Sequence, residues 1–292
     1  MLILSWNIQY GKGCDGHVSL ERIASVIRGM GEPDVICLQE VSRWLQLQDN
    51  VPGSDQLAEI QRLFPDYEAI FGAAVEARLA NTNRRWQFGN LMLTRLPVSS
   101  VFHHPLPRPA DAGARHMPRQ ATELSVTLAA RSVRIVNTHL EFGSSLQRTA
   151  QLKRLCELNE EVNANNLAPP SSDLNGPYQK LNRAEHCIIC GDFNFGVDFA
   201  EYAMMLDASG ETGTSFKDAW SIVHGPRQHH PTCGVFDQIQ WPQGPHCRDF
   251  FFVTNGLSAA VYDVIVNTDT DASDHQPIMM FLSDEFFADN EA

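Results

Sequence analysis

The chain has 292 residues, of which 43% are hydrophobic and 9% aromatic, a composition typical of a globular protein with a buried core. Its 35 acidic and 22 basic residues give a formal net charge of −13, which argues against a broad electrostatic footprint on nucleic acid. No apolar run approaches the ~20 residues that span a bilayer, and the N-terminus lacks the basic region of a signal peptide. Because the seven cysteines are irregularly spaced, we expect no disulfide framework and a cytoplasmic location.

The first half of the chain alternates apolar runs with helical patterns. Residues 2–11, "LILSWNIQYG", predict a buried strand followed by a loop. Residues 19–31 carry an apolar stripe at helical spacing, with Ser19 as the expected N-cap. Further strands are predicted at residues 33–41, 89–95, 121–129 and 132–141, and a second helix at residues 56–64.

The second half begins with the longest helical pattern, residues 145–163, followed by a predicted surface loop at residues 165–182. Further elements are expected as strands at residues 186–195, 249–254 and 277–282, and a helix around residues 198–206. Without a repeat or a clear linker, residues 1–283 are predicted to form a single domain and residues 284–292 a frayed acidic tail. Strands outnumber helices, which predicts sheets covered by helices.

Polar side chains recur at the ends of the buried apolar runs. These residues are Asn7, Glu40, Asn137, His139, Asp192, Asn194, Asp249, Asp274 and His275. One such residue is explained by a turn or a satisfied core position, but the whole set implies a shared polar site. Several carboxylates buried together are costly unless a cation neutralises them. Oxygen ligands of this kind favour Mg²⁺ or Mn²⁺, so we expect a divalent metal site.

Other candidate metal ligands receive structural interpretations. Cys187 and Cys190 are three residues apart on a predicted strand and would face opposite sides, so we expect reduced core cysteines. The pairs His103-His104 and His229-His230 lie in predicted loops, where we expect a surface role.

Arginine is concentrated in one stretch, residues 78–119, which holds seven arginines and the single acid Asp111. The arginines are Arg78, Arg84, Arg85, Arg95, Arg108, Arg115 and Arg119. Two interpretations remain open: a solvated basic loop, or a cationic wall that holds an anionic substrate.

Five motifs occur in order along the chain: "WNIQYG", "LQEV", "NTHLE", "GDFN" and "SDHQPI". Together they resemble the endonuclease/exonuclease/phosphatase superfamily, whose fold is that of pancreatic-type deoxyribonuclease. The resemblance implies an α/β protein with a four-layer α/β/β/α sandwich of two packed mixed sheets flanked by helices. It also implies Mg²⁺-dependent (or Mn²⁺-dependent) hydrolysis of a phosphate ester in a cleft at one edge.

The resemblance also assigns roles to residues of the site. Glu40 is implied as the principal metal ligand, with Asn7 beside it and Asp274 near the metal. The pair Asp192 and Asn194 would position the attacking water and the phosphate. Gln9 stands where several nucleases of the family have an aspartate, so a second metal is in doubt.

The remaining roles concern proton transfer and substrate contact. His139 would hydrogen-bond the phosphoryl group, and Asp249 would orient the catalytic His275. Either His275 or Asp192 could act as the base. We expect Arg119 and Asn90 to contact the substrate, and Arg84 and Arg85 to form mobile rim contacts.

The sequence leaves the substrate open. We favour a small or lipid-derived phosphoester, partly because "DAW" (Asp218 to Trp220) is similar to sphingomyelinase-like phosphodiesterases. The sequence contains no obvious apolar membrane-docking hairpin, although Trp241-Pro242 lies in a predicted loop of suitable character. The alternatives are a nuclease acting on DNA or RNA, and a binding module with a degraded site; no protein partner is implied. Because Glu40, Asp192 and His275 are all present, an enzyme is expected.

Overall fold

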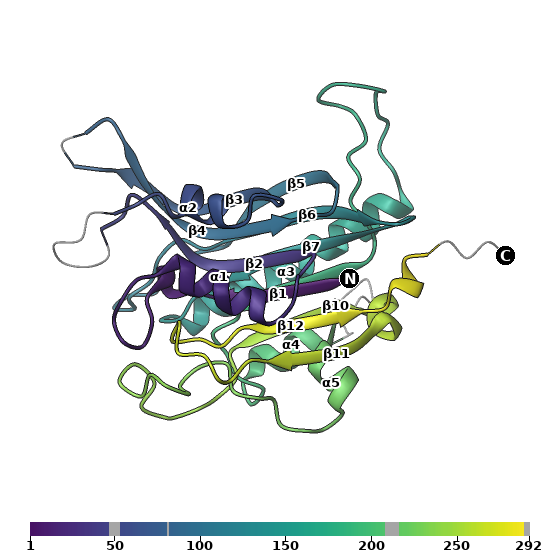
Figure 1. The fold of residues 1–292 in the computed structure, drawn as a ribbon. Helices are drawn as coiled ribbons and strands as arrows, with labels where there is room; N and C mark the ends of the chain where they lie inside the picture. The colour runs from purple at the N-terminus through teal and green to yellow at the C-terminus, as the bar shows by residue number, and fades with distance from the viewer. Residues whose placement is uncertain (47–52, 81, 208–215, 289–292) are drawn as a thin grey trace.

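Two six-stranded mixed sheets pack face to face in the computed structural model, which describes residues 1–46, 53–80, 82–207 and 216–288 (Figure 1). The first sheet has the order β11-β12-β1-β2-β4-β3 and the second the order β5-β6-β7-β8-β10-β9. The strands of the first sheet are β1 (Leu2–Asn7), β2 (Val35–Arg43), β3 (Glu68–Arg78), β4 (Arg85–Thr94), β11 (Val261–Val266) and β12 (Ile278–Leu282). Those of the second are β5 (Val98–Pro105), β6 (Gln120–Leu128), β7 (Arg131–His139), β8 (Cys187–Asp192), β9 (Phe216–Asp218) and β10 (Asp249–Thr254).

Helices cover the outer face of each sheet. The helices are α1 (Leu20–Gly29), α2 (Gln56–Leu63), α3 (Ser145–Leu167), α4 (Ala200–Leu206) and α5 (Ala219–His224), with short 3₁₀ turns η1 (Gln9–Gly11), η2 (Asn255–Ala260) and η3 (Asp284–Phe286). As expected, Ser19 caps α1 by accepting a hydrogen bond from the Arg22 amide. None of the helices in the described ranges is long and apolar enough to cross a membrane.

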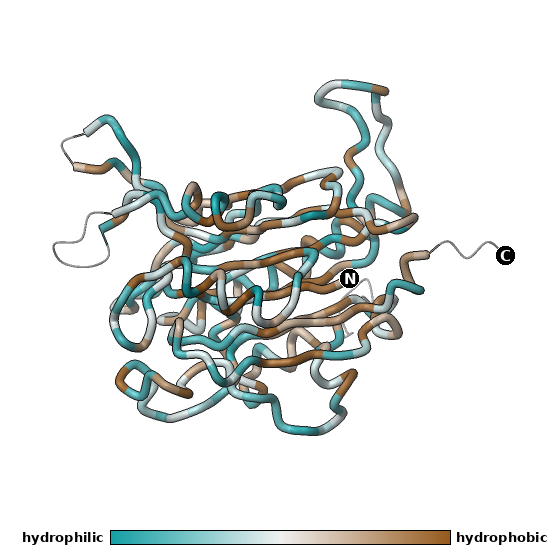
Figure 2. The backbone as a smooth tube through the Cα atoms, in the orientation of Figure 1, coloured by the Kyte–Doolittle hydropathy of each residue, from teal (hydrophilic) through white to brown (hydrophobic). Residues whose placement is uncertain are grey.

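Three clusters of buried apolar side chains hold the two sheets and the flanking helices together. One lies between the sheets, a second packs α1 and α2 on the first sheet, and a third packs α3 and α4 on the second sheet. Figure 2 shows the apolar residues along the central strands and polar residues in the loops that join them. The predicted α/β/β/α sandwich is confirmed. Cys187 and Cys190 are buried in different clusters, as their spacing predicted, and all seven cysteines are free.

Two predicted boundaries were wrong. The helix predicted to end at residue 163 continues to Leu167, so the surface loop begins later than expected. The predicted acidic tail is ordered at its start, because Phe287 is buried in the cluster between the sheets and the N-terminal amine bonds Asp284 at 2.7 Å. Residues 289–292 of that tail lie outside the described residues.

A buried ionic cluster supports the second sheet and predicts acid sensitivity. Burial acts to raise the pKa of Glu123, but His104, Arg183 and Arg134 outweigh it and lower the pKa to about 2. Since the folded pKa is depressed, this carboxylate contributes stability above pH 4.5, and the contribution is lost as the pH falls toward 2. Glu123→Gln should therefore lower the free energy of unfolding by roughly 3–5 kcal/mol at pH 7 and flatten its pH dependence below pH 4.5.

Chemical denaturation between pH 2 and pH 7 measures this effect. Glu161→Gln serves as the control, since it removes the same charge from a half-exposed side chain on α3. Equal stability losses in the two variants would show that the Glu123 cluster contributes no more than a surface pair.

Candidate active site

The topology places several polar strand ends at one edge of the sandwich. Parallel strands β1 and β2 end there in the first sheet, as do the parallel strands β7 and β8 in the second. Antiparallel strand β10 and the segment before β12 begin at the same edge. Asp192 consequently stands between His139 on one neighbouring strand and Asp249 on the other. The two late motifs thus meet the early ones, as the sequence predicted.

Glu40 reaches the site through an irregularity in its strand. The pairing of β2 with β4 shifts between Leu38 and Val41, so two residues face one and a β-bulge results. Glu40 adopts a left-handed backbone with φ of 60°, which is uncommon for a residue other than glycine. The bulge turns Glu40 toward Asn7, although the strand itself continues to Arg43.

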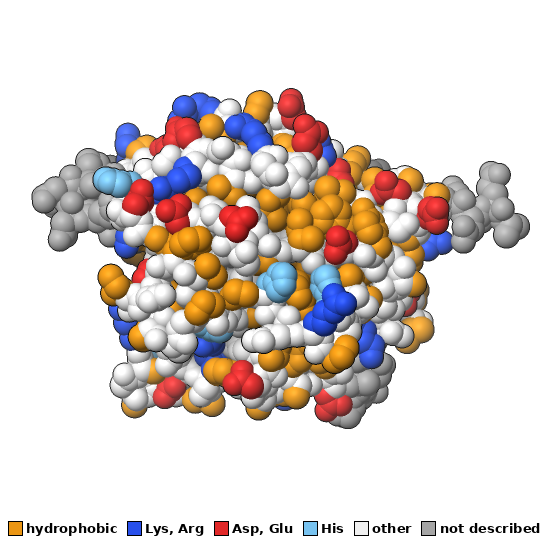
Figure 3. Space-filling view, turned by 60° about the horizontal axis from the view of Figure 1, so that its bottom comes forward, with side chains coloured by type: hydrophobic (Ala, Val, Ile, Leu, Met, Phe, Trp, Pro, Cys, Tyr) orange, Lys and Arg blue, Asp and Glu red, His pale blue; other side chains and the backbone are white. Residues whose placement is uncertain are grey.

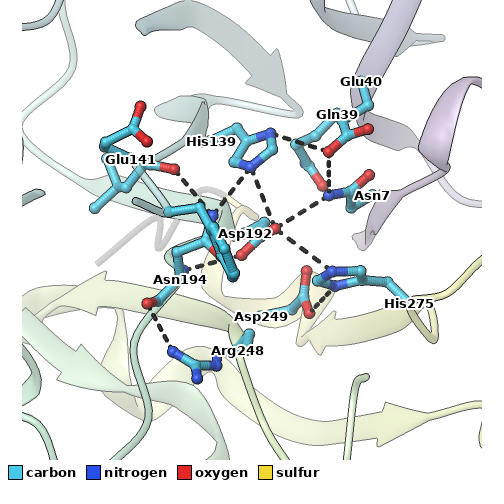
Figure 4. A network of polar contacts seen from close by, with 12 residues as sticks. Asn7, Gln39, Glu40, His139, Glu141, Asp192, Asn194, Arg248, Asp249 and His275 are labelled. Atoms are coloured by element: carbon cyan, nitrogen blue, oxygen red, sulfur yellow. Dashed lines mark hydrogen bonds and ion pairs between the residues drawn. The ribbon is translucent and has the colours of Figure 1, made fainter. Parts of the chain in front are cut away.

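Asn7 joins the two acidic residues of the site (Figure 4). Its side-chain amide donates to Glu40 Oε1 at 3.2 Å and to Asp192 Oδ2 at 3.0 Å. Desolvation and the nearby Asp274 raise the pKa of Glu40 to about 7. Burial acts in the same direction on the pKa of Asp192, but His275, His139 and Asn7 outweigh it and lower that pKa. One carboxyl group therefore holds a proton readily, while the other stays ionised.

His275 lies between two carboxylates. Its Nδ1 is 2.8 Å from Asp249 Oδ2 and its Nε2 is 3.6 Å from Asp192 Oδ2. Burial opposes protonation of His275, but Asp249, Asp192 and Asp274 outweigh it and raise its pKa well above the ordinary value. Burial raises the pKa of Asp249 to about 6, still below neutral pH. At pH 7 the pair is therefore an imidazolium held by a carboxylate.

His139 and Asn194 form the other side of the site. His139 Nε2 is 3.3 Å from Asp192 Oδ2 and 3.1 Å from Asn194 Nδ2. Burial, aided by the charge of Arg119, lowers the pKa of His139 to about 3, so this imidazole is neutral at pH 7. The Asn194 amide also donates to the backbone carbonyl of Leu140, which fixes its orientation.

Arg119 lines a small pocket together with Glu40, Asn90 and His139. Its side chain is only 6% exposed and its Nε donates to Glu141 Oε2 at 3.1 Å. Its Nη1 is buried and has no hydrogen-bond partner among the described residues. A buried donor of this kind costs free energy unless a ligand accepts from it. Arg119 and Asn90 thus line the same pocket as Glu40, and their contact with a substrate stays a prediction.

Glu141 was not singled out from the sequence, although it ends the quoted motif "NTHLE". Besides Arg119, its carboxylate accepts from the amides of Gly143 at 2.8 Å and Met117 at 3.3 Å. Burial disfavours its charge, but these donors outweigh burial and lower the pKa of Glu141. Glu141 therefore fixes the direction in which Arg119 enters the pocket.

Asp274 is held by residues that the sequence did not identify as part of the site. Gln240 Nε2 donates to Asp274 Oδ2 at 2.7 Å, and Trp241 Nε1 donates to the same oxygen at 3.3 Å. Gln9 in turn donates to Gln240 at 3.2 Å. Trp241 is only 3% exposed and its ring packs edge-on against His275, so the structure gives it a place in the site rather than at a membrane surface. No sequence pattern marked this loop.

Arg84 and Arg85, the other two arginines predicted to contact the substrate, lie farther from the acidic residues of the site. Arg84 and Arg85 are exposed at the end of the β3–β4 hairpin, which projects beyond the sheet (Figure 1). Arg84 stacks over Trp44, and Arg85 pairs with Glu76 at 3.2 Å. Asn90 lies five positions after Arg85 along β4, a span of roughly 16 Å. Arg84 and Arg85 could contact a small substrate bound at the acidic residues of the site only if the β3–β4 hairpin bent toward it.

Three interpretations from the sequence need correction. Asn137 is buried between the sheets, where it bonds Gln39 at 2.8 Å, so it braces the fold and lies outside the site. His229 is not a surface residue: its side chain is 11% exposed and lies 2.7 Å from Asp218. Asp218 itself caps α5, which gives "DAW" a structural explanation.

The described residues offer two sets of possible metal ligands. Asp192, Asp249 and His275 have ligand atoms within 4.8 Å of one another. Both nitrogens of His275 face carboxylates, however, and its raised pKa keeps it protonated, whereas a metal binds the neutral ring. Glu40 and Asn7, with Asp274 nearby, offer carboxylate and amide oxygens and include no histidine.

Comparisons with known proteins agree with the fold. The endonuclease/exonuclease/phosphatase family model matches residues 4–275. A comparison with curated protein sequences gives no significant match. A solved endonuclease/exonuclease/phosphatase from Beutenbergia cavernae has a TM-score of 0.67 and 22% identity, covering 97% of this chain and 72% of that one.

Two further solved structures extend the comparison. Truncated TDP2 from Caenorhabditis elegans has a TM-score of 0.62 and 22% identity, with 97% of each chain covered. The mannosyl-6-phosphatase Bt3783 from Bacteroides thetaiotaomicron has a TM-score of 0.66 and 17% identity, covering 97% of this chain and 99% of that one. These likenesses show a shared fold, while the family model spans nearly the whole chain. The chain therefore belongs to the endonuclease/exonuclease/phosphatase family of phosphoesterases.

Proposed function

We propose that this protein is a divalent-metal-dependent phosphoesterase that acts on a small or lipid-derived phosphate ester. The observation that carries the proposal is the pocket shared by Glu40, Asn90, Arg119 and His139, in which Arg119 Nη1 is buried without a hydrogen-bond partner in the described part of the chain. A phosphoryl group supplies the acceptor oxygens that Arg119 lacks. Asp192 adjoins this pocket, since it lies 3.3 Å from His139.

The residues present fit a divalent cation. Burial and the nearby Asp274 raise the pKa of Glu40 although Asn7, Arg119 and His275 act to lower it, so the charge of this carboxylate is only partly compensated. We propose that Glu40 is the principal ligand, with the Asn7 side-chain oxygen beside it and Asp274 close by. Hard oxygen donors of this kind suit Mg²⁺ or Mn²⁺. When bound, such an ion would neutralise and polarise the phosphate.

The protein side chains would bind the phosphate, orient the attacking water and transfer its proton. Arg119 would hold the phosphoryl oxygens, and His139, neutral at pH 7, would hydrogen-bond the phosphate. Asp192 is ionised and would orient the attacking water and accept its proton. His275 already holds a proton, so we assign it the stabilisation of negative charge on the phosphoryl group, with Asp249 fixing the ring.

The distribution of charge favours a small substrate over duplex nucleic acid. Arg119 is buried, whereas Arg84 and Arg85 project on a hairpin, so these three arginines do not share one surface. On the face shown in Figure 3, lysine and arginine side chains are scattered among acidic and apolar ones. Of the structural relatives, one is named a mannosyl-6-phosphatase and another is TDP2. A nuclease remains the second candidate.

A substrate panel tests the proposed function. Phosphomonoesters, phosphodiesters, lipid phosphoesters in vesicles and short oligonucleotides would be assayed with Mg²⁺ or Mn²⁺ and with excess chelator. We expect turnover of at least one small or lipid ester, lost in chelator and restored by added metal. Faster turnover of oligonucleotides would favour the nuclease. Binding without turnover of any panel member would favour a binding module.

Arg119→Ala should slow turnover of the best substrate by a factor of about 10 to 100, as expected for a lost hydrogen bond to a charged group. Arg119→Lys, which keeps a partner for Glu141, should retain more activity but not the bidentate contact. Arg84→Ala and Arg85→Ala should mainly raise KM, most visibly at low salt. Steady-state kinetics separates these effects; wild-type parameters in all of these variants would exclude the segment from substrate binding.

A further inference from the structure

A groove with a volume of about 630 Å³, partly open to solvent, lies next to the active site. Its walls come from the loop after β8, from residues 228–231, and from residues 243–248 before β10. The volume suits a small organic group beyond the phosphate being hydrolysed. The function proposed above uses none of the residues that line this groove.

Arg248 is the cation on the groove wall, and it is held in place without an ion pair. Its Nη1 donates to the Asn194 backbone carbonyl at 2.7 Å, and its guanidinium lies over the Phe199 ring at 5.2 Å. The same guanidinium carbon lies 6.0 Å from the centroid of the Trp241 ring. Within the described ranges no carboxylate is at ion-pair distance, and Nε is buried without a hydrogen-bond partner. An oriented, unneutralised guanidinium suits recognition of phosphate or carboxylate oxygens.

The groove and the active site share a wall. Asn194 N donates to Asp192 Oδ1 at 2.9 Å, and the carbonyl of the same residue accepts from Arg248. Two hydrogen bonds and one residue of backbone therefore separate Asp192 from the guanidinium, a distance of roughly 9 Å or less. Figure 4 shows Arg248 on the side of Asn194 away from His139. A substrate with a phosphate beside Asp192 could therefore reach the Arg248 guanidinium through a spacer of a few carbon atoms.

The other polar groups of the groove suit the organic part of such a ligand. Burial, with the Arg248 charge contributing, lowers the pKa of His246; its Nδ1 lies 2.7 Å from the Gly244 carbonyl and its Nε2 3.2 Å from Cys233 Sγ, so the ring is a fixed wall of the groove. Gln228 and Gln243 add amide groups, and Asp198 is the acid on the wall, an acceptor for hydroxyl groups. The lining is therefore that of a site for a hydroxylated compound with one anionic group.

We propose that Arg248 and this groove bind a second phosphate of a small substrate, so that the enzyme prefers bisphosphorylated over monophosphorylated compounds. This proposal rests on the proposed function, because it assigns the substrate class of the same site. The overall charge of −13 argues against a nucleic-acid backbone as the source of the second phosphate. The first phosphate would bind at Arg119 and the second at Arg248.

The test compares kcat/KM for fructose 1,6-bisphosphate with that for fructose 6-phosphate, with Mg²⁺ present. We expect the wild-type protein to prefer the bisphosphate by a factor of about 10 or more, mainly through KM. Arg248→Gln should reduce this preference to within about twofold, while Arg248→Lys should retain part of it. The preference is the ratio of the two kcat/KM values of one variant. A general loss of activity or of folded protein lowers both values equally and leaves this ratio unchanged.

Arg227→Gln is the matched control, since it removes one charge from an exposed arginine nearby that does not line the groove. It should keep the wild-type preference. An active wild-type protein without a preference, or an Arg248→Gln variant that keeps it, would overturn the second subsite alone. Failure of the wild-type protein to hydrolyse any member of the ester panel would instead refute the proposed function. A 5′-phosphorylated oligonucleotide preferred over the bisphosphate in an Arg248-dependent manner would overturn the assignment to a small molecule.

Discussion

Glu40→Gln should reduce turnover by a factor of about 10³ or more and weaken the binding of Mg²⁺ or Mn²⁺. Glutamine has the same shape and can still accept the hydrogen bond that Asn7 donates to Glu40 Oε1. The substitution therefore removes the negative charge with little change in packing. Because Asn7 is neutral, the loss of Glu40 removes the charge of the principal proposed ligand, and Asn7 cannot replace it. Steady-state kinetics and metal titration by calorimetry measure the two effects.

The control for this substitution is Glu68→Gln, which removes the same charge from an exposed glutamate on β3. This control should keep wild-type kinetics and metal affinity. Thermal unfolding of both variants would verify that each is folded. Full activity of the wild-type protein in excess chelator, or unchanged metal affinity in Glu40→Gln, would refute the assignment of Glu40 as the metal ligand.

His275→Ala and Asp249→Ala should each slow turnover by a factor of about 10² to 10⁴, and the double variant should be little slower than either. The reason is that Asp249 acts through His275, to which it is bonded at 2.8 Å. Without Asp249, the ring loses its orientation and part of the field that keeps it protonated. Without His275, Asp249 has no group to orient. Turnover rates of the three variants at saturating substrate give the coupling free energy between Asp249 and His275.

Stability must be followed in the same set, because removing one partner leaves a buried charge uncompensated and can cost roughly 3–5 kcal/mol. Asp249→Asn is the matched variant, since it keeps the shape of the side chain and removes its charge. His17→Ala, in an exposed loop after β1, should leave turnover unchanged. Additive rate losses in the double variant would show that Asp249 and His275 act independently.

The candidate site could be predicted because its residues sit at the ends of strong strands. Asn7, Asp192 and Asp249 each adjoin an apolar run that is buried on both faces, and such runs are recognisable in the sequence. Their meeting follows from the packing of the two sheets, which the order of motifs anticipated. Gln240 and Trp241 were not found, because they reach Asp274 from a loop that has no periodicity.

The strands that the sequence did not reveal are those at the sheet edges. β3 and β11 border the first sheet, and β5 and β9 border the second. An edge strand has a neighbour on one side only, so part of its surface faces solvent and its apolar pattern is weak. In β3, for example, a single residue, Gly72, is fully buried. These strands owe their conformation to pairing with the neighbouring strand rather than to their own composition.

The sequence by itself determined the central strands, the capped helices and the residues that gather at the site, because apolar periodicity and capping are local properties. Tertiary structure alone decided how those residues act. The β2 bulge turns Glu40 toward Asn7, two carboxylates flank His275, and Glu141 fixes Arg119. Each depends on contacts between residues far apart in the chain. Protonation and donor direction are set by burial and by such neighbours, and neither can be derived from local sequence.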